Sequence, residues 1–170
     1  KHLIELPDLA TFRIKGSTRR VTGDEHPLDL DELIQLMNAG PRPKHRAMWA
    51  VLGGNGLRPS ELQRLKWELV DWEVGLLTIP GHSDGPGAGA GKTEQSASTV
   101  PMTPLVRTEL RGWWERCGEP TEGVMFWGAR LGEPYRSTSG FKTALKTAAT
   151  AAGIERKVTP YLLRDSFATI

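Results

Sequence analysis

Two arginines, each close to the start of a predicted helix, are the side chains of this sequence best suited to chemistry on an anion. Arg58 lies in the stretch GNGLRPSEL (residues 54–62), with Glu61 three positions later, and Arg164 lies in TPYLLRDSFAT (residues 159–169). A guanidinium group offers paired N–H donors that match two oxygens of a phosphate. Two such groups from different helices can hold a phosphate while negative charge builds on its oxygens, and a nearby carboxylate can orient them.

A lysine in a glycine-rich connection is the third candidate. Lys92 lies in residues 81–97, which contain five glycines and no large apolar residue. The flanking runs, residues 75–80 and 98–102, are β-prone and are predicted to pair as antiparallel strands. The connection has little to bury, so we expect it to be poorly ordered without a partner, and Lys92 to lie away from the arginines. A lysine delivered by such a loop can give a proton to a departing oxygen.

The elements that must position these groups are mainly helical. Apolar residues at helical spacing, bounded by glycine and proline, predict six helices. The fold class predicted is α+β, mainly helical with a small antiparallel β-sheet at one edge. The predicted helices cover residues 27–40, 44–52, 59–67, 104–117 and 139–152, and a last one begins near Pro160 and continues to Ile170.

The three stretches occur in the order that the tyrosine recombinase, or phage integrase, family uses, and the chain resembles its catalytic domain from about Leu28 to Ile170. Residues 56–61 (GLRPSE) match the first arginine motif, and LQRLKWELVDW resembles the family's continuation into its small sheet, through Leu65, Trp67 and Asp71. The second motif usually reads His-x-Leu-Arg-His-Ser/Thr-Phe-Ala-Thr. Here residues 161–169 read YLLRDSFAT.

This resemblance implies site-specific DNA recombination or integration through a phosphotyrosine intermediate, with double-stranded DNA as partner and a tetrameric synapse as the expected assembly. Arg58 and Arg164 would converge on the phosphate, and Lys92 would be the general acid. Glu61 would orient the charged groups. Tyr161 replaces the usual histidine and is a candidate hydrogen-bond donor, although a phenol is a poor acid or base near neutral pH. No metal and no cofactor is expected, because arginine and lysine supply the charge.

The domain organisation expected is an incoming linker or the end of a DNA-binding arm at residues 1–25, followed at 26–170 by a catalytic domain without its C-terminal part. The family's nucleophilic tyrosine would come from a third motif after Ile170. The tyrosines in the chain are Tyr135 and Tyr161, and neither matches that motif. The 170 residues are therefore predicted to be inactive in cleavage by themselves.

Two alternatives remain open at this point. One is a recombinase-like domain that binds DNA without cutting it, which the tyrosine at position 161 favours. The other is a nucleotide-binding enzyme, because residues 87–93 resemble the phosphate-binding loop GxxxxGK[ST]. That motif is incomplete here, since Pro86 occupies the place of its first glycine and the residues after Thr93 would make a poor helix.

Composition excludes several further classes of protein. The 22 basic and 20 acidic residues give a formal net charge of +2, so a nucleic-acid role requires local segregation of charge. The single cysteine, Cys117, excludes an internal disulfide framework and a multi-cysteine zinc site. The sequence contains no apolar run of the length that spans a bilayer and no signal-peptide core at its start. We expect a cytoplasmic protein of bacterial or phage origin.

Overall fold

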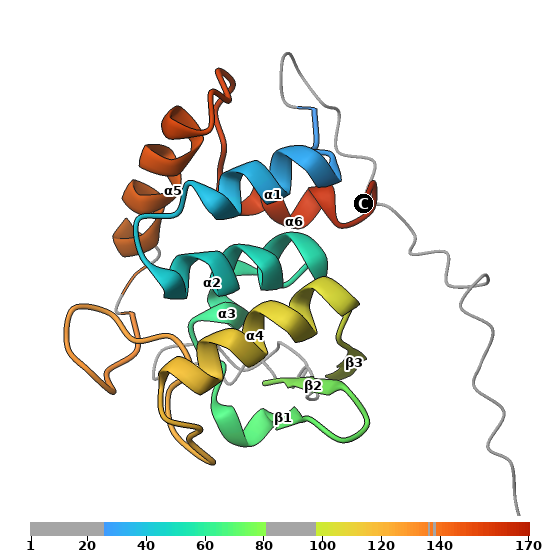
Figure 1. Cartoon of the computed structure of the whole chain (residues 1–170), viewed down its shortest axis with the longest axis vertical. Coiled ribbons are helices and arrows are strands. Elements are labelled where there is room, and N and C mark those ends of the chain that lie inside the picture. Colours follow the sequence, from blue (N-terminus) through green and yellow to red (C-terminus); the bar gives the residue numbers. More distant parts are fainter. Residues whose placement is uncertain (1–25, 81–97, 136, 138) are drawn as a thin grey trace, which may run out of the picture.

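The computed structural model describes residues 26–80, 98–135, 137 and 139–170 (Figure 1). It confirms the predicted α+β class, with helices predominating and one three-stranded antiparallel sheet at an edge. The elements in chain order are α1 (Leu30–Asn38), α2 (Pro43–Gly54), α3 (Pro59–Leu62), η2 (Trp67–Leu69, a 3₁₀ turn), β1 (Val70–Asp71), β2 (Leu76–Ile79), β3 (Ser98–Pro101), α4 (Pro104–Arg116), α5 (Ser139–Ala151) and α6 (Pro160–Ser166).

Helix α2 is the centre of the fold. It packs against α1 and α6 on one side and against α4 on the other (Figure 1). Ten of its 12 residues are buried, as expected for a helix that is surrounded by others. It continues two residues past its predicted end, because Gly53 and Gly54 allow neighbouring side chains to approach closely. A Cβ atom on Gly54 would lie 2.8 Å from Cγ2 of Val106 on α4.

Two ionisable residues near the start of α2 belong to the core. Lys44 and His45 are each 5% exposed. The Lys44 ammonium donates to the Trp127 carbonyl at 2.8 Å. The His45 ring stacks on Trp49, with ring centroids 5.6 Å apart, and its Nδ1 has no hydrogen-bond partner among the described residues. Burial, followed by the charges of Lys44 and Arg42, lowers the pKa of His45 to about 4. Its neutral form is therefore the one that fits the fold.

The sheet confirms the predicted pairing of the two β-prone runs. Strands β2 and β3 pair antiparallel, with Leu77 opposite Val100, and β1 adds a short third strand along the other edge of β2. Helix α4 holds the β1–β2 turn through Arg107, whose guanidinium donates to the Trp72 carbonyl at 2.8 Å. The Arg111 guanidinium stacks on the Trp72 ring at 4.3 Å from its centroid.

The predicted helix over residues 59–67 is wrong in its length. Helix α3 ends at Leu62, and the chain at Lys66 is extended, with φ −129° and ψ 158°. The Trp67 N–H donates to the Gly123 carbonyl at 3.0 Å, and the Leu65 carbonyl accepts from the Met125 N–H at 3.0 Å. This long-range bridge uses backbone groups that a continued helix would have needed.

The last helix is also shorter than predicted, because α6 ends at Ser166 rather than continuing to Ile170. Tight turns follow, in which the Phe167 and Thr169 N–H groups donate three residues back, at 3.2 and 2.9 Å. Side-chain hydroxyls of Ser166 and Thr169 bond to Leu28, at the opposite end of the described chain. The end of this helix thus lies against the start of the described chain.

The part of the chain that the structure describes contains no helix with the length and apolar character needed to cross a bilayer. Residues 1–25 and the connection 81–97, which includes Lys92, lie outside the described residues. The expected linker, the expected disorder of the connection and the position of Lys92 therefore stay predictions.

Candidate active site

Arg58 is held in place by Glu61, on the first turn of the helix that it precedes. Arg58 occupies the position before Pro59 with an extended backbone, φ −71° and ψ 148°, and the proline begins α3. Its main-chain N–H donates to one Glu61 carboxylate oxygen at 2.7 Å, and its Nη1 donates to the other at 2.8 Å. The Arg58 side chain is 48% exposed, whereas that of Glu61 is 15% exposed. The half-buried carboxylate orients a guanidinium that keeps further N–H donors for an anion.

Arg164 lies in the last turn of α6 and is partly exposed. Among the described residues it makes no ion pair, so neither Glu155 nor Asp165 neutralises it. Tyr161 precedes it by three positions and is 54% exposed. Residues three apart share a helix face, so the Tyr161 hydroxyl and the Arg164 guanidinium are presented by the same side of α6.

The two arginine motifs are in direct contact, through the backbone of Gly56 and the ring of Phe167. Gly56, two residues before Arg58, adopts φ +65°, and a Cβ atom added to it would lie 2.8 Å from the ring of Phe167. Phe167 comes three residues after Arg164. The loop before α3 and the end of α6 are therefore side by side, although 106 positions separate the arginines in sequence. That the guanidinium groups of Arg58 and Arg164 converge on one phosphate stays a prediction.

The loop that carries Arg58 is also tied to the sheet. The Asn55 side-chain amide donates to the Pro101 carbonyl at 2.8 Å, and its oxygen accepts from the Thr103 N–H at 3.2 Å. Pro101 is the last residue of β3, the strand that follows the connection containing Lys92. The base of that hairpin is thus fastened to the first arginine motif.

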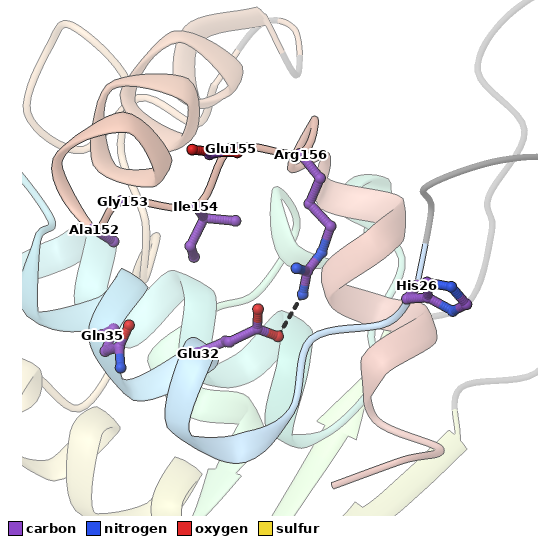
Figure 2. Close-up of a pocket in the computed structure, with 8 residues that line it drawn as sticks. All are labelled: His26, Glu32, Gln35, Ala152, Gly153, Ile154, Glu155 and Arg156. Atoms are coloured by element: carbon purple, nitrogen blue, oxygen red, sulfur yellow. Dashed lines mark hydrogen bonds and ion pairs between the residues drawn. The ribbon is translucent and has the colours of Figure 1, made fainter.

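A metal-binding cluster is not found at these motifs within the described residues. No group of three or more histidine, cysteine, aspartate or glutamate side chains that could bind a metal occurs there. A depression of about 670 Å³ lies instead beside α1 and the α5–α6 connection (Figure 2). It is bordered by the ion pair between Arg156 and Glu32, and none of the predicted site residues lines it. The side chains of Arg58 and Tyr161 in the candidate site are themselves exposed.

Sequence reasoning did not identify the roles of Asn55 and Ser166. Both stand inside the quoted motifs, but their partners lie 46 and 138 positions away. An Asn-Gly pair at a helix end is a turn signal, which could have drawn attention to position 55. No local pattern shows what a serine in the last turn of α6 would bond to.

Comparisons with known proteins agree with this arrangement. A family profile described as "Phage integrase family" matches residues 26–170. The tyrosine recombinase XerA of Pyrococcus furiosus is 32% identical over 141 residues, which are 82% of this chain and 45% of that protein. The chain thus spans about half the length of the curated relatives that it matches.

Solved structures share the fold. The crystal structure of XerA recombinase superposes with a TM-score of 0.68 at 24% identity, covering 89% of this chain and 51% of that one. The Tn1549 transposon integrase, in complex with transposon right end DNA, superposes with a TM-score of 0.65 at 20% identity, covering 88% of this chain and 54% of that one. With a family profile that covers all of the residues after position 25, these matches show that the chain belongs to the phage integrase family, the tyrosine recombinases.

Proposed function

We propose that the protein to which this chain belongs is a site-specific DNA recombinase or integrase, acting on double-stranded DNA through a phosphotyrosine intermediate. The observation that carries the proposal is the junction of the two arginine motifs. Gly56 packs on Phe167, and Glu61 orients the exposed guanidinium of Arg58. The Tn1549 integrase, which shares this fold, was solved with DNA. The family profile and the relatives named as recombinases favour the recombinase interpretation over DNA binding alone and over nucleotide binding. The sequence that resembles a nucleotide-binding loop lies outside the described residues.

In the proposed reaction a tyrosine oxygen attacks phosphorus, the bond from phosphorus to the 5′ oxygen breaks, and that oxygen takes up a proton. Arg58 and Arg164 would bind the non-bridging oxygens, on which negative charge builds. Tyr161 would donate a further hydrogen bond from the Arg164 face of α6. Lys92 would give the proton to the 5′ oxygen. These groups need neither a metal nor a cofactor for the charge that they stabilise.

The tyrosine nucleophile is proposed to lie in a third motif after Ile170. Tyr135 does not suit the role, because its ring packs edge-on against Phe141 at 5.5 Å and lies under the Lys44 ammonium at 5.1 Å. Burial raises the pKa of Tyr135, which opposes formation of the reactive phenolate. Tyr161 is exposed but lies on the helix that carries Arg164, three residues from it.

We further propose that the domain follows an arm at residues 1–25 and that copies of the protein assemble on DNA as a tetrameric synapse. We also propose that the protein is cytoplasmic and is encoded by a bacterium or a phage. A lambda integrase of the same fold, at 21% identity and a TM-score of 0.60, was solved as a dimer bound to a core site. Sedimentation of the protein with one and two DNA sites tests the assembly.

Trapping a covalent protein–DNA adduct on a nicked suicide substrate tests the reaction, using the full-length protein. Arg58→Ala and Arg164→Ala should each lower adduct formation by a factor of about 10² or more, because each removes charge stabilisation at the phosphate. The matched control is Arg130→Ala, since Arg130 is 74% exposed and, among the described residues, pairs with the neighbouring Glu133 at 3.4 Å. A folded, DNA-binding protein that forms no adduct would establish the binding-only alternative instead.

Lys92 has a test of its own. Lys92→Ala should leave DNA affinity nearly unchanged and lower cleavage by about 10² to 10⁴, the range of a general acid. A substrate with sulfur in place of the 5′ oxygen, a better leaving group, should restore cleavage by Lys92→Ala and not by Arg58→Ala. Equal restoration of both variants would place the acid on another residue.

A further inference from the structure

Ser166 is a fully buried polar residue in the second arginine motif, two positions after Arg164. Its hydroxyl accepts the Leu28 N–H at 2.7 Å and donates to the Leu162 carbonyl at 2.8 Å. Both bonds are buried, and the first joins residues 138 positions apart. The side chain is thus committed to protein partners and connects α6 to the segment that leads into α1.

The other main-chain group of Leu28 is bonded to the same motif. The Thr169 hydroxyl lies 2.8 Å from the Ser166 carbonyl and 3.4 Å from the Leu28 carbonyl, and its single proton is shared between these two acceptors. Two hydroxyls, three positions apart, thus contact both polar backbone groups of Leu28. Leu28 itself is fully buried. We call residues 28–32 the entry segment. It comprises the two residues before α1 and the first three residues of that helix.

An ion pair attaches the entry segment a second time. Arg156, in the connection before α6, pairs with Glu32 (Figure 2). The same Glu32 oxygen accepts the Asp29 N–H at 3.1 Å, and Glu32 N–H donates to Asp29, which together cap α1. The entry segment is therefore bonded both to the end of α6 and to the chain just before it.

We infer that Ser166 is a positioning residue, through which the entry segment sets the orientation of α6 and hence of Arg164. The inference rests on the proposed function, in which Arg164 binds the phosphate. Helix α6 has seven residues, and α2 restrains it on one side, where Leu163 is fully buried. The Ser166–Leu28 bond lies on the same face, three positions further along, and ties the last turn of the helix to the chain before α1. Arg164 lies in that last turn and carries its charge at the end of a long side chain, so a small shift of the turn moves the guanidinium group.

The same arrangement couples Arg164 to the chain before Leu28. Any displacement of the entry segment pulls on the hydroxyls of Ser166 and Thr169, and these belong to the motif that supplies Arg164. Ser166 contacts no reacting atom in this scheme. Its effect on cleavage passes through the arginine, so it should alter the rate on bound DNA and not the binding of DNA.

The experiment compares two hydroxyl deletions on one helix in the full-length protein. Ser166→Ala removes the bond to the entry segment. Thr159→Ala removes a bond of the same kind at the other end of α6, where the Thr159 hydroxyl accepts the Leu162 N–H at 3.1 Å. Adduct formation at saturating DNA, DNA affinity and the folded fraction are measured for both, together with Ser166→Thr, which keeps the hydroxyl.

We expect Ser166→Ala to lower the rate of adduct formation about tenfold while DNA affinity changes less than about twofold, because misplacing a positioned group slows chemistry more than binding. Ser166→Thr should recover the rate, and Thr159→Ala should remain within about twofold of wild type once folded fractions are matched. Equal rates for Ser166→Ala and Thr159→Ala, or a rate loss matched by a loss of affinity, would overturn the inference. A normal rate for Arg164→Ala would instead contradict the proposed function.

Two further measurements decide the matter if Ser166→Ala fails to fold. Thr169→Val removes the contact of the other hydroxyl with Leu28, together with its 2.8 Å bond to the Ser166 carbonyl, at an exposed position. It should lower the rate about threefold at unchanged affinity, whereas a wild-type rate would overturn the inference. Amide hydrogen exchange of Leu28 in the 170-residue chain reports whether its N–H is still bonded to the hydroxyl at position 166. If the extra methyl of Ser166→Thr breaks this bond, Leu28 should exchange faster and the variant should also lose its rate of adduct formation. Fast exchange with a normal rate would equally overturn it.

Discussion

Protonation of His45 should destabilise the domain below about pH 6.5. The ring is 5% exposed, stacks on Trp49 and lies beside two cationic residues, Lys44 and Arg42. The native state therefore disfavours the imidazolium, while the unfolded chain binds the proton with the ordinary affinity of histidine. A depressed native pKa means that full stability is present above the unfolded value and is lost as the pH falls toward the folded value.

The magnitude follows from the two pKa values. A fall from 6.5 in the unfolded chain to about 4 in the fold corresponds to about 3 kcal/mol in the free energy of unfolding, at about 1.4 kcal/mol per unit. About 2 kcal/mol of this should be lost by pH 5. The loss should be complete near pH 4, below which both states bind the proton.

Urea unfolding of the 170-residue chain at a series of pH values provides the assay. The comparison variant is His45→Phe, which keeps a ring over Trp49 and cannot titrate. Subtracting its pH profile from that of wild type removes the contribution of carboxylates, which both proteins share. A wild-type minus His45→Phe difference that changes by less than about 0.5 kcal/mol between pH 7 and pH 5 would refute the reasoning.

Two further predictions concern the first arginine motif. Gly56→Ala should lower the free energy of unfolding by about 2 kcal/mol or more, because φ is +65° and the new Cβ would meet the Phe167 ring. The control is Gly153→Ala, where φ is +70° and a Cβ would meet open space, so the free energy of unfolding should fall by only about 1 kcal/mol. If the two variants unfold alike in urea, the Phe167 contact is not rigid. Glu61→Gln should change stability by less than about 1 kcal/mol, since Arg58 is half exposed, yet lower adduct formation about tenfold. Parallel losses of stability and rate would assign Glu61 a merely structural role.

The sequence was sufficient where local signals and tertiary packing agree. Helices α4 and α5 begin and end within one residue of their predicted bounds, since each has a clear apolar stripe and turn residues beyond it. The pairing of β2 with β3 was also predicted correctly. Glu61 was expected to orient the charged groups from its spacing and from the family resemblance, and the structure shows its carboxylate bonded to Arg58, while the role itself stays a prediction.

One error occurs where distant backbone groups compete with local preference, since helix α3 stops after one turn because residues near Trp67 bond to Gly123. Helix α6 passes into tight turns after Ser166, beside the bond between the Ser166 hydroxyl and Leu28. Neither partner is visible from the spacing of apolar residues. The buried positions of Lys44 and His45 could not be predicted for the same reason, since only the assembled core shows which face of α2 is covered.

The position of α2 between α4 and α6 also bears on the order in which the chain folds. During synthesis α4 is complete well before α6, so one face of α2 can be covered while the face that receives α6 is still bare. At about 5–20 residues per second, the roughly 50 residues between the ends of these helices take about 3–10 s to make. For that interval the nascent protein displays apolar surface that a chaperone can bind. Arrest of translation just after α4 should therefore give a chaperone-bound, protease-sensitive chain, and release of α6 should convert it to the protected form.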